Sequence, residues 1–259
     1  MRASDFAPLA SSESACGSCG IASAAAFTFS YAYQPIVDVV ERRVWGHEAL
    51  VRGPSGESAQ SVLSQVNDDN RYRFDQACRV KAIKGAAQIG IEGRLSINFL
   101  PNAIYKPEVC IRTTLAAALA NDFPVARIMF EATEGEAVND GKRLAEILRE
   151  YKRTGFTTAI DDFGAGYAGL NLLADFQPDI VKLDMALVRH VDSSRSRQAI
   201  ARGVLRMCGE LGIEVLAEGI ETLAERDFFL DEGVALMQGY LFGRPAFQAR
   251  GQIDPASWR

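Results

Sequence analysis

Eight strand-like segments alternate with amphipathic segments along this 259-residue chain, and that alternation restricts the possible folds most. Three of the intervening stretches, 74–90, 141–155 and 196–212, space their apolar residues as helices do. The strand-like segments are rich in β-branched and aromatic residues: FTFSYAYQPIVD, VWGHEALVR, LSINFLP, ARIMFEAT, TTAIDDF, DIVKLDM, IEVLAEGI and ALMQGYLFG. Eight strands with helical crossovers predict an α/β fold, a (β/α)₈ TIM-type barrel.

The connection between the first two strands departs from that rule. Only the segment VVERRV separates them, which is too short for a helical crossover. We therefore expect these strands to pair as a hairpin, so that the barrel contains one antiparallel strand.

The chain divides into three parts by composition. Residues 1–26 are rich in Ala, Ser and Gly and are expected to form a flexible N-terminal arm, 27–250 the folded domain, and 251–259 a C-terminal tail. CGSCG in the arm spells C-x-x-C, but no second pair lies nearby, so a plain arm and a redox or metal role both stay open. Gly155 and Gly212 stand where helix C-caps belong.

Charge and cysteine content bear on nucleic-acid binding and on the cellular compartment. The formal net charge of −5 gives no general basic surface for a nucleic-acid polymer. Three of the five cysteines, Cys78, Cys110 and Cys208, occur in apolar or helical contexts and are expected to be buried thiols. An odd cysteine count, no signal-peptide pattern and no apolar run near ~20 residues predict a cytoplasmic protein that does not enter a membrane.

Polar residues recur near the C-terminal ends of the predicted strands, where barrel active sites form. They are Glu48, Asn98, Glu131, Asp161, Asp162, Lys182, Glu218 and Gln238. A single acidic residue there often caps the next helix instead. Five carboxylates on one rim would repel one another, however, and a cation removes that conflict.

The donor types favour Mg²⁺ or Mn²⁺ over zinc, because the candidates offer oxygen and only two histidines occur in the chain. The adjacent Asp161 and Asp162 suit a pair of metals, because one carboxylate can bridge the two ions while its neighbour binds the second ion. Side chains of neighbouring strand residues point to opposite faces, so both can converge only where the strand ends. The glycines at 164, 166 and 169 are expected to supply that ending and a mobile loop over the substrate.

The same glycines spell G-x-G-x-x-G, the dinucleotide-binding pattern, and Asp184 lies roughly where a ribose-binding acid would follow. Two carboxylates directly before the loop would repel a pyrophosphate, which weighs against this alternative.

The segments EALVR, INF, FEATE, DDFGAGY, VKLD, AEGIE and QGYLFGRP resemble the EAL domain, named for the tripeptide at Glu48-Ala49-Leu50. The resemblance covers about residues 28–248. It implies a barrel with one antiparallel strand that hydrolyses cyclic di-GMP to linear pGpG with two Mg²⁺ or Mn²⁺ ions, and we also expect a homodimer.

Carried over residue by residue, the resemblance implies one metal on Glu48, Asn98, Glu131 and Asp161, and a second on Asp161, Asp162 and Glu218. Lys182, Glu218 and Gln238 would act in catalysis. Leu50 and Arg52 would bind the substrate, and Glu134 would anchor the DFGAGY loop. Lys182 could instead be a barrel-interior lysine paired with Asp184, and Arg52 a surface arginine.

The loop departs from the usual family spelling DFGTGYSSL, with Ala165, Ala168 and Gly169 replacing hydroxyl residues. The lost hydroxyls remove possible hydrogen bonds within the loop, which bears on the rate of the reaction and on the loop's coupling to dimerisation. The metal ligands are not affected, because every expected ligand is present. A catalytically silent cyclic di-GMP receptor or protein-interaction module is the alternative function.

Overall fold

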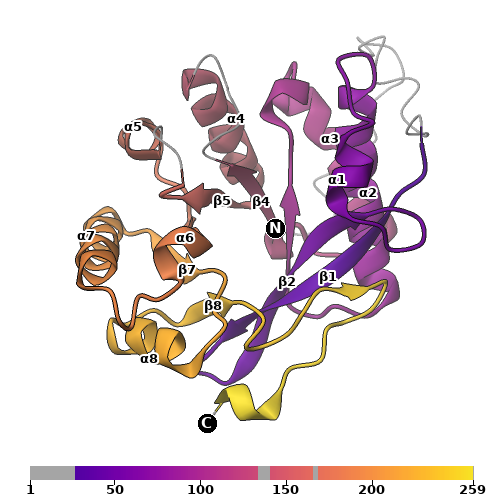
Figure 1. Cartoon of the computed structure of the whole chain (residues 1–259). Helices are drawn as coiled ribbons and strands as arrows, with labels where there is room; N and C mark the ends of the chain where they lie inside the picture. The colour runs from indigo at the N-terminus through magenta and orange to yellow at the C-terminus, as the bar shows by residue number, and fades with distance from the viewer. Residues whose placement is uncertain (1–26, 134–140, 166–168, 259) are drawn as a thin grey trace.

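The computed structural model describes residues 27–133, 141–165 and 169–258. Eight strands close into a barrel, and helices surround it (Figure 1). The strands are β1 (Ser30–Asp38), β2 (Arg43–Arg52), β3 (Arg94–Asn98), β4 (Ile128–Thr133), β5 (Thr157–Phe163), β6 (Ile180–Leu183), β7 (Glu214–Ala217) and β8 (Leu236–Gln238), with β9 (Ala246–Phe247) added outside β1.

The helices lie in the connections between the strands, and three of them overlap the stretches 74–90, 141–155 and 196–212 that the sequence periodicity predicts. They are α1 (Ala59–Leu63), α2 (Arg71–Gln88), α3 (Pro107–Ala120), α4 (Gly141–Thr154), α5 (Gly169–Asp175), α6 (Met185–Val188), α7 (Arg195–Leu211) and α8 (Leu223–Asp231). Gly212 caps α7 in the left-handed conformation, φ 68°, as expected for a helix C-terminus. Gly155, directly after α4, has φ 97°.

The predicted hairpin is confirmed. β1 runs antiparallel to β2 on one side and to β8 on the other, while β2 to β8 pair in parallel from neighbour to neighbour. The barrel is therefore the expected α/β barrel with one antiparallel strand. The short link between β1 and β2 leaves no room for a helix, so the second strand has to return beside the first.

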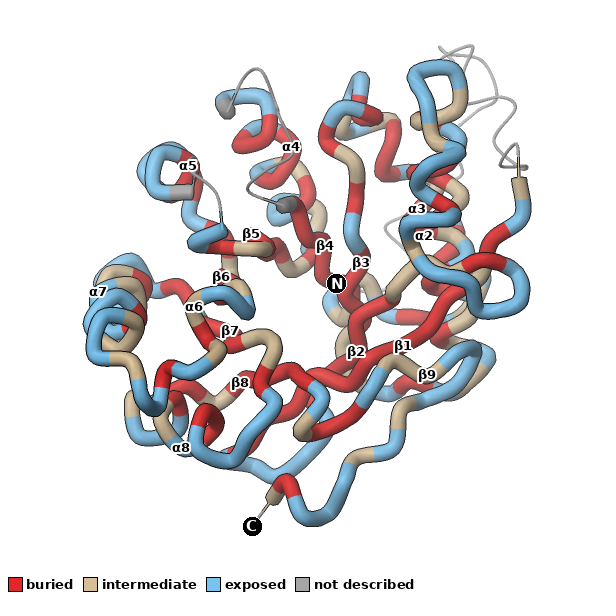
Figure 2. Tube along the Cα trace, in the orientation of Figure 1, coloured by how far each residue is buried: buried red, intermediate tan, exposed pale blue. Residues whose placement is uncertain are grey.

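Two apolar clusters lie on opposite faces of the strands. The larger one fills the layer between the strands and the helices. Figure 2 shows in red that most strand residues are buried, whichever face they point to. The smaller one shares the strands but uses the alternate positions, which point into the barrel: Ile36, Trp45, Met129, Ala159, Ile180, Leu216 and Leu236. This inner cluster is a packed apolar layer, on which any polar group in the barrel must rest.

Three further features of the described residues concern expectations from the sequence. Cys78, Cys110 and Cys208 are free and buried, as predicted. The last predicted strand is shorter than its apolar run, because after Gln238 the chain turns at residues 239–243, where the Gly243 N–H donates to the Gly239 carbonyl. No helix among the described residues has the length and apolarity needed to cross a membrane.

Candidate metal centre and substrate cavity

A polar layer lies directly above the inner apolar layer. Side chains two residues apart on a strand point to the same face. On each of five strands, the residue two positions beyond an inner apolar residue is polar: Glu131 after Met129, Asp161 after Ala159, Lys182 after Ile180, Glu218 after Leu216 and Gln238 after Leu236. β1 runs the other way, so its Gln34 precedes Ile36. The strand period alone thus gathers these groups at the C-terminal end of the barrel.

Lys182 lies at the centre of this layer with none of its surface exposed. Its Nζ is 2.8 Å from Glu218 Oε1, 2.9 Å from Glu131 Oε2 and 3.0 Å from Asp161 Oδ1. Glu48 Oε2 lies farther away, at 3.9 Å. Lys182 is therefore a barrel-interior lysine paired with acids, but with these four and not with Asp184. The Asp184 carboxylate instead accepts the Ala186 N–H and caps α6.

Two carboxamides donate hydrogen bonds to the Glu48 carboxylate. Asn98 Nδ2 donates to Glu48 Oε1 at 3.0 Å, and Gln238 Nε2 donates to Glu48 Oε2 at 2.8 Å. Gln238 Oε1 is buried and has no hydrogen-bond partner in the described structure. An acceptor left unpaired in this way is suited to a donor such as water or substrate.

Asp161 and Asp162 both reach the cavity, but the turn after the strand is not the whole reason. The register between β5 and β6 shifts between Ile160 and Phe163, and Asp162 itself has φ 54°. This irregularity cancels the alternation of side chains. The Asp162 N–H then donates to Asp161 Oδ1 at 2.9 Å, which keeps the two carboxylates together. The expectation that the glycines supply the convergence is corrected: the bulge begins before Gly164.

The carboxylates form two overlapping groups in which ligand atoms lie within 4.8 Å of one another. One contains Glu48, Glu131 and Asp161, all buried; the other contains Asp161, Asp162 and Glu218. Asp161 belongs to both groups. The buried acidic cluster is consistent with a metal site for a hard cation, since it offers oxygen atoms only.

The electrostatics show how much charge the cluster concentrates. Burial raises the pKa of Glu131 to about 8, against the attraction of Lys182, and raises the pKa of Asp162 to about 6, with the charge of Asp161 adding to it. Burial and Asp161 also raise the pKa of Glu218 well above its usual value. Burial alone would raise the pKa of Asp161 too, but the charge and hydrogen bond of Lys182 lower it overall. The cluster thus holds more acid than one ammonium can neutralise.

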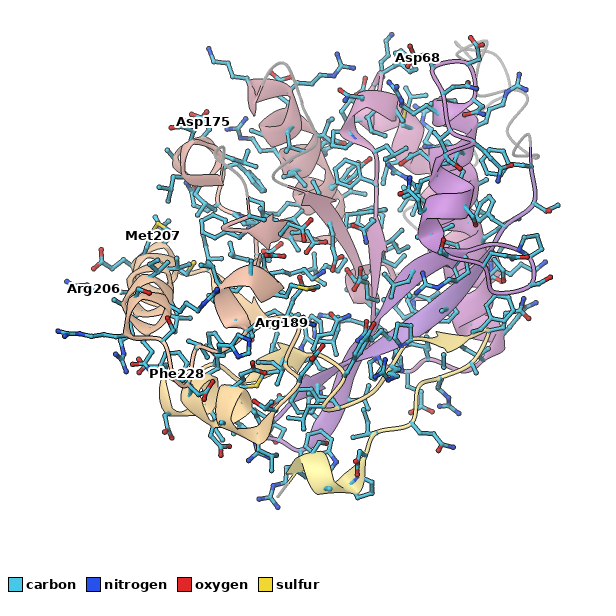
Figure 3. All side chains as sticks on the ribbon, in the orientation of Figure 1. Asp68, Asp175, Arg189, Arg206, Met207 and Phe228 are labelled. Atoms are coloured by element: carbon cyan, nitrogen blue, oxygen red, sulfur yellow. The ribbon has the colours of Figure 1, made fainter. Side chains whose placement is uncertain are left out.

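A cavity of about 230 Å³ opens above the cluster. Its walls add residues that the strand-end pattern did not single out: Gln34, Met185, Arg189, Glu221 and Tyr240. Arg189, labelled in Figure 3, follows α6 and pairs with Glu221 at the rim. Gln34 lies on β1, but the other four lie in segments that follow strands and have no periodic signal, so only the fold brings them here. Ser96, which donates to Glu131 Oε1, was also missed, although it lies two positions before Asn98 on β3.

Three predicted site residues lie apart from this cavity or outside the described structure. Leu50 lines a second cavity of about 270 Å³ together with Asn98, Phe99 and Leu100. Arg52 ends β2, and its Nη1 donates to the carbonyl of its neighbour Val51. Glu134 lies outside the described residues, as do positions 166–168 of the glycine loop and the CGSCG arm. The roles of all three residues stay predictions.

Comparison with known proteins places this geometry in a family. The sequence pattern of the EAL domain matches residues 22–245. A standalone versatile EAL protein from Vibrio cholerae O395, solved in a cyclic di-GMP-bound form, is 53% identical, with a TM-score of 0.88 over 90% of this chain and 99% of that chain. Klebsiella pneumoniae BlrP1, solved as a manganese and cyclic di-GMP complex at pH 6, is 38% identical, with a TM-score of 0.81 over 87% of this chain and 57% of that one.

A curated relative has a different named role. The blue light- and temperature-regulated antirepressor BluF of Escherichia coli K12 is 33% identical over 215 residues, covering 83% of this chain and 53% of that protein. The chain spans about half or less of the length of the first curated relatives it matches. The match over most of the chain, the barrel with its one antiparallel strand and the acidic cluster agree, and the chain belongs to the EAL-domain family.

Proposed function

We propose that this chain hydrolyses cyclic di-GMP to linear pGpG at the acidic cluster, with two Mg²⁺ or Mn²⁺ ions. EAL domains are typically cyclic di-GMP phosphodiesterases, and two relatives have been solved with that nucleotide. The observation that carries the proposal is the cluster itself: buried oxygen donors on successive strands surround one lysine at the rim where barrel active sites form.

The charge of the cluster fits two divalent cations. Five carboxylates and one ammonium give a formal charge of −5 + 1 = −4 before any proton is taken up. Two divalent ions would balance it. Glu48, Asn98, Glu131 and Asp161 would hold one ion, and Asp161, Asp162 and Glu218 the other. When bound, such ions stabilise charge on phosphodiester oxygens and lower the pKa of water.

The chain's own groups would divide the remaining work. Lys182 keeps a buried positive charge next to the acids, where it can attract a phosphate oxygen. Gln238 Oε1, buried and unpaired, can accept a hydrogen bond from the attacking water and orient it. Glu218, whose carboxylate lies beside Asp161 at the floor of the cavity, would accept the proton that the water releases. Arg52 offers a planar fork for a phosphate, and Leu50 an apolar contact for the nucleotide.

The test is incubation of the purified chain with cyclic di-GMP and Mg²⁺ or Mn²⁺, followed by chromatographic separation of pGpG. Asp161→Asn should reduce turnover by orders of magnitude, because Asp161 belongs to both ligand groups. Asp179→Asn is the matched control. Asp179 lies just before the N-terminal end of β6, at the end of the barrel opposite to the cluster, and its carboxylate accepts hydrogen bonds from the Thr158 N–H and hydroxyl. Equal turnover by both variants would contradict the site assignment.

A receptor or partner-binding function is the alternative, and the similarity to the antirepressor BluF favours it. The two functions separate in one experiment. If the wild-type chain binds cyclic di-GMP tightly in calorimetry but yields no pGpG with either metal, the receptor function replaces the enzyme. The homodimer is likewise a proposal, which light scattering of the chain with and without nucleotide tests.

A further inference from the structure

A buried ion pair lies behind the metal-ligand strands, on the face away from the cavity. Asp75 and Arg79, one turn apart on α2, are 1% and 0% exposed, and Asp75 Oδ2 lies 2.9 Å from Arg79 Nη2. Neither residue lines the cavity above the carboxylate cluster, whereas Asp75 lines the second cavity beside Asn98. Exchanging a buried pair for apolar side chains often leaves stability unchanged or raises it, so stability alone does not account for this one.

Asp75 contacts the backbone that follows Asn98. Asp75 Oδ1 accepts the Leu100 N–H at 2.9 Å, two residues beyond the Asn98 carboxamide that holds Glu48. β3 ends at Asn98, so the ladder no longer fixes the chain at Leu100. A charged acceptor makes a stronger hydrogen bond than a neutral one. The Asp75 carboxylate therefore sets where the end of β3 leaves the barrel.

Arg79 contacts an aromatic ring next to each of two proposed ligands, Asn98 and Glu131. Its guanidinium carbon lies 5.6 Å from the ring centre of Phe99 and 4.9 Å from that of Phe130. Phe99 directly follows Asn98, and Phe130 directly precedes Glu131. Because side chains alternate, these rings point outward to Arg79 while the neighbouring ligands point inward.

Tyr151 on α4 completes the group. Arg79 Nη1 donates to Tyr151 Oη at 2.8 Å, and the Tyr151 ring lies 4.8 Å from Phe130 and 5.4 Å from Phe99, centre to centre. Arg79 Nε has no hydrogen-bond acceptor among the described residues. The guanidinium is thus held by one carboxylate, one hydroxyl and three ring faces, an arrangement that a flexible lysine cannot reproduce.

We propose that Asp75 and Arg79 are positioning residues for the metal centre: they fix the end of β3 and the middle of β4, and thereby the Asn98 and Glu131 ligands. This inference rests on the proposed metal site. Groups that orient metal ligands typically change metal affinity about 10–100-fold when mutated. A small shift of the β3 end would separate Asn98 from Glu48 without disturbing the other carboxylates.

The experiment measures Mn²⁺ affinity of the full chain by calorimetry, without nucleotide, alongside thermal melting. Arg79→Lys should weaken Mn²⁺ binding about 10-fold or more. Tyr151→Phe, which removes only one hydroxyl, should weaken it less. Ile213→Ala is the control, since Ile213 is buried just before β7 at the far end of the barrel: it should lower the melting temperature and leave Mn²⁺ affinity unchanged.

A second measurement keeps the inference testable if Arg79→Lys does not fold. Amide hydrogen exchange of Leu100 in Tyr151→Phe should be faster than in the wild type, because loosening Arg79 loosens Asp75. Wild-type Mn²⁺ affinity in a folded Arg79→Lys, or unchanged Leu100 exchange in Tyr151→Phe, would overturn the inference. Failure of the wild type itself to bind Mn²⁺ would instead overturn the proposed function.

Discussion

Replacing Lys182 with methionine tests how the barrel tolerates its acidic layer. Lys182 Nζ lies within 3.0 Å of three carboxylates, and methionine keeps much of the side chain's volume while removing the charge. Removing one partner from a buried ion pair costs about 3–5 kcal/mol, because the remaining charge is left uncompensated. At about 2–4 °C per kcal/mol for a chain of this size, the metal-free variant should melt about 6–20 °C below wild type.

The loss of stability in Lys182→Met should depend on pH. Burial has already raised the pKa of Glu131 to about 8 in the presence of Lys182, and without the ammonium the carboxylates become harder still to ionise. At low pH they take up protons and the repulsion disappears. The difference in unfolding free energy between wild type and Lys182→Met, measured by urea denaturation in chelator, should therefore be larger at pH 9 than at pH 6.

Divalent metal should restore much of the lost stability, because Mn²⁺ would supply the missing positive charge. Lys152→Met is the matched control: Lys152 pairs with Asp179 at 2.8 Å but is 45% exposed, so its loss should cost less than about 1 kcal/mol. Mn²⁺ should not reduce that cost. A Lys182→Met deficit that is the same at both pH values, with and without Mn²⁺, would refute the reasoning.

Three further outcomes follow from other parts of the structure. Gly164 has φ +98°, and an added Cβ would lie 2.4 Å from Leu187 Cδ1, so Gly164→Ala should lower the free energy of unfolding by about 1–3 kcal/mol in urea denaturation. Gly203→Ala is the control: Gly203 lies on α7 with no atom near an added Cβ, so this substitution should be neutral or stabilising. Burial, with the charge of Arg250, lowers the pKa of His47 to about 4. The unfolded chain then binds the extra proton between about pH 4 and 6.5, so the free energy of unfolding decreases as the pH is lowered through that window, by roughly 3 kcal/mol at most, and His47→Leu should remove this slope. After chelation, Mg²⁺ or Mn²⁺ should restore pGpG formation in chromatography and Ca²⁺ should restore it poorly, because its coordination is looser.

The sequence predicts those features that depend on short-range rules. A link of a few residues cannot hold a helix, which is enough to predict the antiparallel β1 and β2. Period-2 alternation is enough to place Glu131, Lys182 and Glu218 on one face once their strands are recognised. Both rules act within a few residues, so tertiary structure has little chance to override them.

Other features depend on tertiary packing and have no local signal. The bulge that turns Asp162 toward the cavity is set by the pairing of β5 with β6. Arg189 reaches the cavity rim from the segment after α6, far from any strand-end pattern. A barrel-interior Lys182 was the alternative to its catalytic role, with Asp184 as partner. Its actual partners lie on three strands and directly after a fourth, so their identity depends on closure of the barrel.

Asp75 and Arg79 show the limit most clearly. In the sequence they are an acidic and a basic residue four apart on a helix, the pattern of a solvent-exposed pair that contributes a few tenths of a kcal/mol. In the structure they are nearly inaccessible, because α2 packs this face against Phe99 and Phe130. Burial converts a minor surface contact into a rigid charged group behind two ligand strands. The apolar layers on both sides of the strands keep the barrel folded. Polar groups packed against these layers can therefore serve to position other side chains, both in the carboxylate cluster inside the barrel and at the Asp75–Arg79 pair outside it.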